Sequence, residues 1–328
     1  MKRMFLKFAA ATVAGTLISA CGGTDSGDDQ TPGTLVEVAS RGTFSGLVLA
    51  ATKAGLVDEL SAANANVTLL APTNDAFGLL ANQLGFSTIG AMVDALPAST
   101  LESILLYHVL PGRLPRPDLL AGGPSQNTSL VQGATTLALA LNTTSGIRIT
   151  DAIGRIGIIG LTDVPTDNGV FHVIDRVLLP PGLLTVLQTV KSNPERFQSL
   201  VNIVNPALTT ALNDGSASYT LFAPVDEAFT AAATLLQPLA ANQIEAALRY
   251  HVLGSRVLSS EITFGTPLPT LLAGQTFTIN AGVAPVLAVI DDTTATDARV
   301  TGVDIIASNG VVHVIDKVLL PVLPAPSP

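Results

Sequence analysis

The chain has 328 residues, a net charge of −9 at pH 7 and 48% hydrophobic residues, a composition that suits folding through core burial. An acidic chain is poorly suited to binding nucleic acid, or to binding anionic lipid through a basic patch, because those partners repel it. Cys21 is the only cysteine, which excludes disulfides and thiolate metal sites within the chain.

The first 20 residues have the pattern of an export signal. Lys2, Arg3 and Lys7 precede an apolar run over residues 8–20 that is too short to span a bilayer comfortably. The run ends in Leu-Ile-Ser-Ala-Cys, which resembles the lipobox of bacterial lipoproteins. The resemblance implies cleavage before Cys21 and acylation of its sulfur and of its freed amine. The alternative is an ordinary secretory signal followed by a chance cysteine.

Cleavage would leave a lipid-anchored and more acidic protein. The leader contains three basic residues and no acid, so its loss changes the net charge from −9 to −12. Several acyl chains on Cys21 anchor stably where one chain would not. Gly22 stands where an aspartate would signal inner-membrane retention, which favours the outer membrane. Residues 21–33 predict a flexible acidic tether, with the folded part facing the periplasm or the cell exterior.

Three sequence blocks occur twice in the same order, which indicates a tandem duplication. The paired blocks are TLLAPTNDAF and TLFAPVDEAF, LLYHVL and LRYHVL, and NGVFHVIDRVLLP and NGVVHVIDKVLLP. Each copy is far longer than a solenoid repeat of roughly 20–50 residues, so we expect two domains, each with its own core. We place them at residues 34–180 and 183–321, joined by Pro-Pro-Gly and followed by a proline-rich tail at residues 322–328.

These blocks resemble the motifs of the fasciclin domain family, namely its T-x-F-A-P-T-x-x-A-F motif, its short Tyr-His motif and its closing N-G-x-x-H-x-I-D-x-V-L-L-P motif. The resemblance implies an α+β fold for each domain, a small β-wedge flanked by helices. It also implies adhesion or extracellular interaction rather than catalysis. The motif residues with an implied structural role are Pro72, Tyr107, His108, His172 and Asp175, then Pro224, Tyr250, His251, His313 and Asp316.

Apolar residues at helical spacing predict helices early in each copy. The two stripes are Phe44, Leu47, Val48, Ala51 and Leu60, then Phe197, Leu200, Val201, Val204, Leu208 and Leu212. Pro206 should start a new helix. Short strands are predicted at residues 67–71 and 219–223. We expect Thr73 to cap the next helix, with Asp75 in its first turn. In the second copy Val225 cannot cap, so Asp226 should cap one residue later.

Helices over residues 98–109 and 242–252 should carry the Tyr-His pairs near their C-terminal ends, where the helix dipole favours a charged imidazole. Asn168-Gly169 and Asn309-Gly310 predict tight turns before the last strands. The remaining predicted strands are 137–141, 146–150, 155–161 and 170–179, with counterparts near 276–280, 286–290, 299–303 and 311–320.

The four histidines are the candidates for catalysis or metal binding, but their surroundings favour a structural role. Both faces of the strand that holds His172 are apolar, as in a buried strand, and a buried polar group must be hydrogen-bonded. No His-x-x-x-His pair occurs, although the two histidines of one domain could still meet in space. Asp291, Asp292 and Asp297 crowd one loop without the glycine and glutamate of a calcium loop. We therefore predict no metal and no cofactor.

The sequence contains no nucleophile elbow, phosphate-binding loop or dinucleotide fingerprint. We therefore predict that the chain is not an enzyme but an anchored adhesion protein whose partner is a protein or glycan of the cell surface or matrix. Two weak modules on one tether would gain avidity. The alternative is a carrier of a hydrophobic small molecule such as a carotenoid or a lipid, since some relatives bind carotenoids. The absence of tryptophan leaves few rings for such a cage.

Overall fold

The computed structural model describes residues 32–132, 134–144, 146–282, 288–292 and 296–323. The predicted signal, Cys21, nearly all of the tether, part of the aspartate-rich loop and the end of the tail lie outside these ranges. Within them, no single helix is long and apolar enough to cross a membrane. One pair, Ile89–Ala95 and Ala98–Tyr107, passes that test only jointly and is bent by 115° at its break.

Both copies of the duplicated sequence contain helices first and then strands. We call the described residues up to 180 the first repeat and those from 183 onwards the second repeat. The first repeat contains α1 (Leu35–Arg41), α2 (Ser45–Ala54), α3 (Val57–Ser61), β1 (Val67–Pro72), α4 (Asn74–Gln83), α5 (Ile89–Ala95), α6 (Ala98–Tyr107), β2 (Val109–Pro111), α7 (Arg116–Ala121), β3 (Ser125–Gln132), β4 (Thr135–Asn142), β5 (Arg148–Thr150), β6 (Ile156–Pro165) and β7 (Gly169–Ile174). The second repeat contains α8 (Val186–Lys191), α9 (Pro194–Ile203), α10 (Pro206–Asn213), β8 (Tyr219–Pro224), α11 (Asp226–Leu236), α12 (Ala241–Tyr250), β9 (Val252–Leu253), the 3-10 helix η1 (Ser259–Glu261), β10 (Pro267–Pro269), β11 (Thr276–Ala281), β12 (Ala288–Asp291), β13 (Ala298–Ala307) and β14 (Gly310–Ile315).

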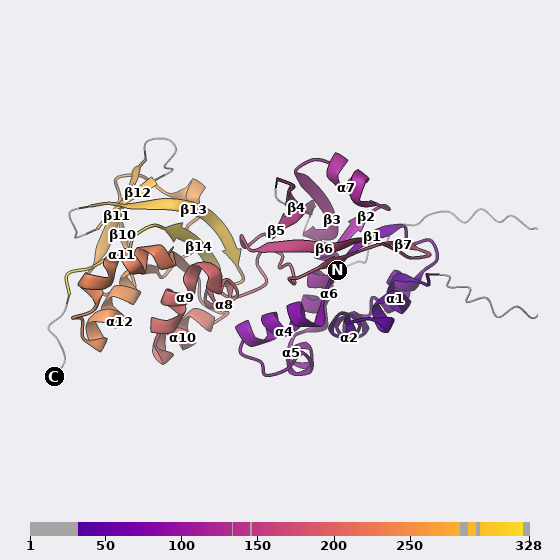
Figure 1. Ribbon diagram of the computed structural model, residues 1–328. Coiled ribbons are helices and arrows are strands. Elements are labelled where there is room, and N and C mark those ends of the chain that lie inside the picture. The colour runs from indigo at the N-terminus through magenta and orange to yellow at the C-terminus, as the bar shows by residue number, and fades with distance from the viewer. Residues whose placement is uncertain (1–31, 133, 145, 283–287, 293–295, 324–328) are drawn as a thin grey trace, which may run out of the picture. The chain divides into compact units, whose positions relative to one another are not determined.

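Each repeat folds around its own mixed sheet of seven strands (Figure 1). The strand order is β2-β1-β7-β6-β5-β4-β3 in the first repeat and β9-β8-β14-β13-β12-β11-β10 in the second. The strand of the first block runs parallel to the strand of the closing block, β1 to β7 and β8 to β14. Gly169 permits this pairing, because a Cβ there would lie 2.4 Å from the carbonyl oxygen of Val67. The predicted α+β class is confirmed.

The sheet of the first repeat buries apolar side chains on both faces. Phe171 of β7 points toward the helical layer and packs edge-on against Phe44, with 5.0 Å between the ring centroids. Leu70 and Ile174 point the other way, into a wedge that Tyr107 helps to fill. Burial of one such side chain contributes about 1.5–3 kcal/mol. The alternation along β1 and β7 therefore places each strand between two cores.

Long helices and central strands lie where periodicity predicts them, and α10 begins at Pro206 as predicted. The closing strands were predicted to continue to Leu179 and Leu320, which is wrong, since β7 ends at Ile174 and β14 at Ile315. Side chains take over the hydrogen bonding there. The backbone N–H of Leu179, for example, donates to a buried carboxylate instead of to a neighbouring strand. The short α1, α5, α7, β2 and β3 were not predicted.

The N-cap of α4 is the one predicted from the sequence. Thr73 has extended backbone angles, and its Oγ1 accepts the N–H of Ala76 at 3.2 Å. α11 begins in the same register with Val225 at the N-cap and no side-chain hydrogen bond. The two repeats therefore differ by one cap.

The predicted capping of α11 by Asp226 is wrong. Its carboxylate accepts the N–H groups of Gln198 and Ser199, at 3.2 and 2.7 Å, just after the break that Phe197 makes in α9. Freed N–H groups at a helix start favour a carboxylate. In the first repeat, Asn74 accepts the N–H of Gly46 at 2.9 Å in the same way. This position therefore caps the neighbouring helix and not its own.

The second repeat lacks a counterpart of α5. The copies are 152 residues apart at Pro72 and Pro224 but 143 apart at His108 and His251. The second repeat is thus nine residues shorter between these motifs. α4 is followed by α5 and then α6, whereas α11 is followed directly by α12. The missing residues correspond to α5.

Candidate functional site

The histidines that end α6 and α12 are buried and bonded through both ring nitrogens. Nδ1 of His108 lies 2.7 Å from the carbonyl oxygen of Ile104, and Nε2 accepts the backbone N–H of Leu178 at 2.9 Å. Because a backbone N–H can only donate, Nε2 is the unprotonated nitrogen and Nδ1 carries the proton. In the second repeat, Nδ1 of His251 lies 2.7 Å from the carbonyl oxygen of Ala247, and Nε2 accepts the N–H of Leu319 at 2.9 Å.

Burial keeps these two histidines uncharged. It lowers the pKa of His108 and of His251 to about 4, against the hydrogen bonds to the Ile104 and Ala247 carbonyls, which act in the opposite direction. The helix dipole favours a charged imidazole at this position, but the cost of desolvating the ion exceeds that attraction. Each ring ties a helix end to the segment that follows the last strand.

His172 on β7 is also buried and bridges two other segments. Nε2 lies 2.8 Å from the carbonyl oxygen of Leu114, and Nδ1 accepts the N–H of Asp163 at 3.2 Å. Burial lowers the pKa of His172, and likewise that of His313. In the second repeat, Nε2 of His313 lies 2.9 Å from the carbonyl oxygen of Val257, and Nδ1 accepts the N–H of Asp304 at 3.3 Å.

Asp163 and Asp304, whose backbone N–H groups donate to these rings, have left-handed backbone angles, with φ of 60° and 58° respectively. Few residues other than glycine adopt this region, and aspartate is among those that do. Asp163 lies where the pairing of β6 with β7 shifts register, so a bulge turns its N–H toward the histidine. Its carboxylate accepts the N–H of Arg116 at 2.6 Å, and Asp304 accepts that of Ser259 at 2.8 Å.

A buried threonine completes the network. Thr68 donates its hydroxyl to the carbonyl oxygen of Gly112 and accepts the N–H of Leu114, both at 2.8 Å. We call residues 112–116 and 255–259 the pinned loops. In each repeat, a threonine, a histidine and an aspartate from three strands hold the loop. In the second repeat, the Thr220 hydroxyl donates to the carbonyl oxygen of Ser255 at 2.7 Å and accepts the N–H of Val257 at 2.8 Å.

The remaining motif residues also bind backbone groups. Asp175 accepts the N–H of Ile158 at 2.7 Å, and the Tyr107 hydroxyl donates to the carbonyl oxygen of Ala138 at 3.2 Å. Pro72 ends β1 opposite the last residue of β7. In the second repeat, Asp316 accepts the N–H of Arg299 at 2.7 Å, and the Tyr250 hydroxyl donates to the carbonyl oxygen of Thr276 at 2.9 Å. Pro224 likewise ends β8.

Sequence reasoning missed several buried polar residues of the first repeat, among them Asn168 and Asp151. Asn168, predicted only as a turn residue, accepts the N–H of Leu35 at 2.9 Å and donates to two carbonyls at the end of α3. Asp151 accepts the side chain of Arg155 and the N–H of Leu179. Both have counterparts 141 residues later, at Asn309 and Asp292. The sequence does contain a signal for their buried role, because the same polar residue occurs in both copies, 141 residues apart.

The buried polar residues of each repeat hold a surface loop in place, and the ring nitrogens of all four histidines are already bonded to backbone groups. The described part of the chain holds no group of three or more histidine, cysteine, aspartate or glutamate residues able to bind a metal. The pinned loops expose Arg113 and Arg116 in the first repeat and Arg256 in the second. We therefore take the pinned loops as the candidate functional site.

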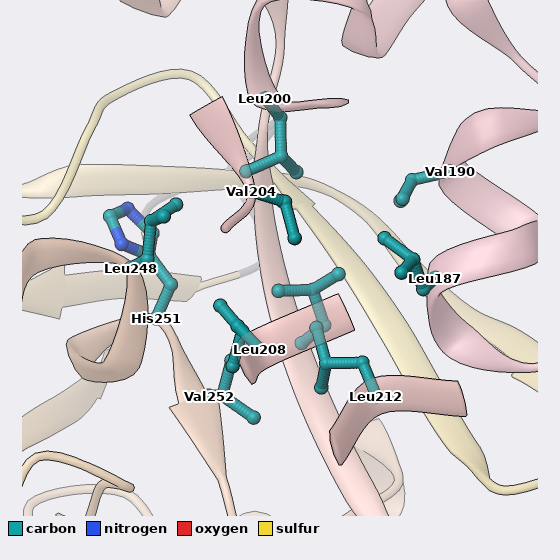
Figure 2. A pocket seen from close by; sticks show the side chains of 10 residues that line it. Leu187, Val190, Leu200, Val204, Leu208, Leu212, Leu248, His251 and Val252 are labelled. Carbon is teal, nitrogen blue, oxygen red and sulfur yellow. The ribbon is translucent and has the colours of Figure 1, made fainter. Parts of the chain in front are cut away.

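Two apolar cavities lie in the second repeat, of about 10 and 20 Å³. Leu200, Leu248 and His251 border both. In Figure 2, Leu187 and Val190 lie across the smaller cavity from Leu248 and His251. Ligand pockets are roughly 300–1,000 Å³, so neither cavity has room for a carotenoid or a lipid chain.

Comparison with known proteins follows the same division into two copies. The Fasciclin domain family matches residues 42–180 and 195–321. The chain is 29% identical to the "Fasciclin-like arabinogalactan protein elcF" of Phaeosphaeria nodorum, over 78% of each chain. It is 36% identical to "Protein sll1483" of Synechocystis, over 45% of this chain and 74% of that one. It is 30% identical to the "Transforming growth factor-beta-induced protein ig-h3" of Sus scrofa, over 88% of this chain and 38% of that one.

A solved FAS1 domain pair from the insect cell adhesion molecule Fasciclin I is 20% identical, with a TM-score of 0.41 over 86% of this chain and 98% of that one. The family match covers most of the chain and contains all three motif blocks of each copy. This chain therefore belongs to the fasciclin domain family.

Proposed function

We propose that this chain is a lipid-anchored interaction protein of the cell envelope, not an enzyme, and that its two fasciclin domains bind a protein or glycan of the cell surface or matrix. Fasciclin domain proteins are typically proteins of adhesion or extracellular interaction. The observation that carries the proposal is the pinned loop. In both repeats, buried polar residues that could serve catalysis are instead used to hold a surface loop in place.

A loop held in this way is suited to recognition. Its backbone is fixed before a partner arrives, so binding orders few additional groups and loses little conformational entropy. The exposed arginines of the two loops can contact carboxylates or the oxygens of a glycan. Two such loops on one chain would add avidity if both engage the same surface.

Binding to intact cells tests this function. Fluorescently labelled protein comprising residues 32–328 should bind saturably, and a variant with Arg116→Ala and Arg256→Ala should lose most of that binding. Neither side chain belongs to the hydrogen-bonded network, so the fold should be kept. Arg41→Ala with Arg299→Ala, two exposed arginines outside the loops, is the matched control for charge. Equal binding by both double variants would rule out the loops as the contact.

The anchor at Cys21 is a separate part of the proposal. Its support is the leader, the lipobox-like sequence and the placement of the single cysteine. Cys21→Ser should move the protein from the membrane fraction to the soluble fraction, and mass spectrometry of the parent should show acylation at Cys21. A variant that stays with the membrane would place the anchor elsewhere.

A further inference from the structure

The two repeats differ most in how their helical layers are covered. In the first repeat α5 packs across α2 and α4 and buries Met92 and Val93. Lys53 of α2 donates to the carbonyl oxygens of Val93 and Asp94, at 2.8 and 2.7 Å, and so caps the C-terminal end of α5. Phe77 of α4 is 2% exposed beneath this cover. The helix thus closes the layer.

The second repeat has the same layer without that helix. Phe229 takes the place of Phe77 by the 152-residue offset and is half-buried, and Ile244 takes the place of the fully covered Leu101 and is also half-buried. Together with Ile203 and Leu236 they border the cavity of about 20 Å³. We call these four residues, Ile203, Phe229, Ile244 and Leu236, the open face.

Smaller side chains deepen the open face. Ala232 and Ala247 stand where the first repeat has Leu80 and Ile104, both buried. Ala247 itself borders the cavity. The second repeat therefore lacks both the covering helix and part of the filling beneath it. The rim is polar, because Glu245 and Arg249 of α12 form an ion pair at 2.9 Å that is partly exposed.

We propose that the open face is a docking site for a short amphipathic helix of a partner protein, one that presents two adjacent bulky apolar side chains as α5 presents Met92 and Val93. The first repeat is the reason for choosing a helix, since it shows what covers this face in a fold with the same helices beneath it. Helix-in-groove binding uses such a shallow apolar surface with a polar rim. The cavity is too small to enclose a free ligand.

The chain supplies its own probe. A peptide with the sequence of residues 87–97, which contains α5, would be labelled with fluorescein and stapled through positions 91 and 95. Both positions are exposed in α5, and a staple is needed because an isolated helix this short is marginal in water. Residues 32–328, which contain both repeats, serve as the protein. We expect fluorescence anisotropy to rise to saturation, and a peptide with Met92→Ser and Val93→Ser to bind at least about tenfold more weakly.

Two variants test the location. Leu236→Asp places a charge in the open face, and Ile244→Ser removes one of its four apolar side chains. Ile244 is half-buried, so the serine variant should fold even if the charged variant does not. Each should weaken peptide binding by about tenfold or more. Leu79→Asp, an exposed leucine on the matching helix of the first repeat, is the control and should bind like the parent.

Several results would overturn the docking site. One is an anisotropy that stays flat up to about millimolar protein. The others are equal binding of the parent and doubly substituted peptides, or a folded Ile244→Ser variant that binds like the parent. The inference deepens the proposed interaction function, but its test uses neither cells nor the lipid anchor. Loss of helix binding would leave the loops and the anchor standing, and failed cell attachment would leave the open face standing.

Discussion

Replacement of His108 by alanine tests whether the buried rings hold the fold. The imidazole joins the end of α6 to the segment after β7, because it donates to the carbonyl oxygen of Ile104 and accepts the N–H of Leu178. Alanine removes both bonds and the ring. The two backbone groups would then lie in a buried site without their partner.

The expected cost follows from those two groups. A buried group left without a hydrogen bond costs about 1–3 kcal/mol. We take the lower part of that range, about 1–2 kcal/mol for each group, because the space left by the ring can admit a water molecule. His108→Ala should therefore lower the free energy of unfolding of the first repeat by about 2–4 kcal/mol. Any volume that stays empty would add to this cost.

Hydrogen exchange read by mass spectrometry, together with urea unfolding followed by circular dichroism, measures the effect and locates it. Exchange should accelerate in peptides that contain the end of α6 and the amide of Leu178, and it should be unchanged in the second repeat. Leu79→Ala removes an exposed side chain of α4 and should change stability by less than about 0.5 kcal/mol.

Two outcomes would refute this reasoning. An unfolding free energy within about 0.5 kcal/mol of the parent would mean that neither backbone group depends on the ring. Normal stability combined with loss of binding to cells would make His108 a functional residue and not a structural one. The corresponding alanine variants of His172, His251 and His313 should behave alike, each within its own repeat.

Three further predictions concern pH, capping and folding. Burial lowers the pKa of His108 and His251 from 6.5 to about 4. The unfolded chain therefore binds more protons between these values, and the stability from each neutral ring, present in full above about pH 6.5, should be lost toward pH 4 by up to roughly 3 kcal/mol. Flat urea midpoints across that window would contradict this. Thr73→Ala should cost about 1 kcal/mol. Val225→Thr should gain less than that, because the Ala228 N–H already bonds to the Val225 carbonyl oxygen at 3.0 Å, and urea midpoints again decide. Residues 183–328 alone should unfold in one cooperative transition, and a molten fragment would count against independent folding.

The sequence predicts the elements whose apolar pattern matches their burial. Leu47 and Ala51 are spaced for one helical face and are both buried in α2, whereas Leu60 of the same predicted stripe is buried in the separate helix α3. β3 shows the opposite case. Its first five residues are Ser-Gln-Asn-Thr-Ser, without apolar alternation, and its pairing with β4 shifts register between Asn127 and Val131. Its strand conformation is imposed by its neighbour, so no local pattern announces it.

Partners far apart in the chain were beyond sequence reasoning. The apolar faces around His172 predict burial, but the Leu114 carbonyl that its ring binds is 58 residues away. The amide of Asn168 binds the N–H of Leu35 across 133 residues. One sequence gives no rule for such pairs. The duplication gives a partial one, because a polar residue present at the same place in both copies is a candidate for a buried role.

The two repeats also show which contacts tolerate change. The hydrogen bonds of the four histidines and of Thr68 and Thr220 match between the repeats. The apolar filling does not match, since Phe171 becomes Val312 and Leu70 becomes Phe222. The close ring pair accordingly moves from one face of the sheet to the other, from Phe44 with Phe171 to Phe222 with Phe277. A buried polar group needs a particular partner, while an apolar core needs mainly volume.

That asymmetry explains where the repeats can differ in function. The pinned loops depend on the polar networks, so both repeats keep the same hydrogen bonds to the loop while its exposed side chains differ. The helical layers depend on packing, so one repeat can lose α5 and still fold around a smaller core. Under the proposed function, differences in partner choice between the two domains are therefore expected at the open face, while the loops would contribute a contact that both domains share.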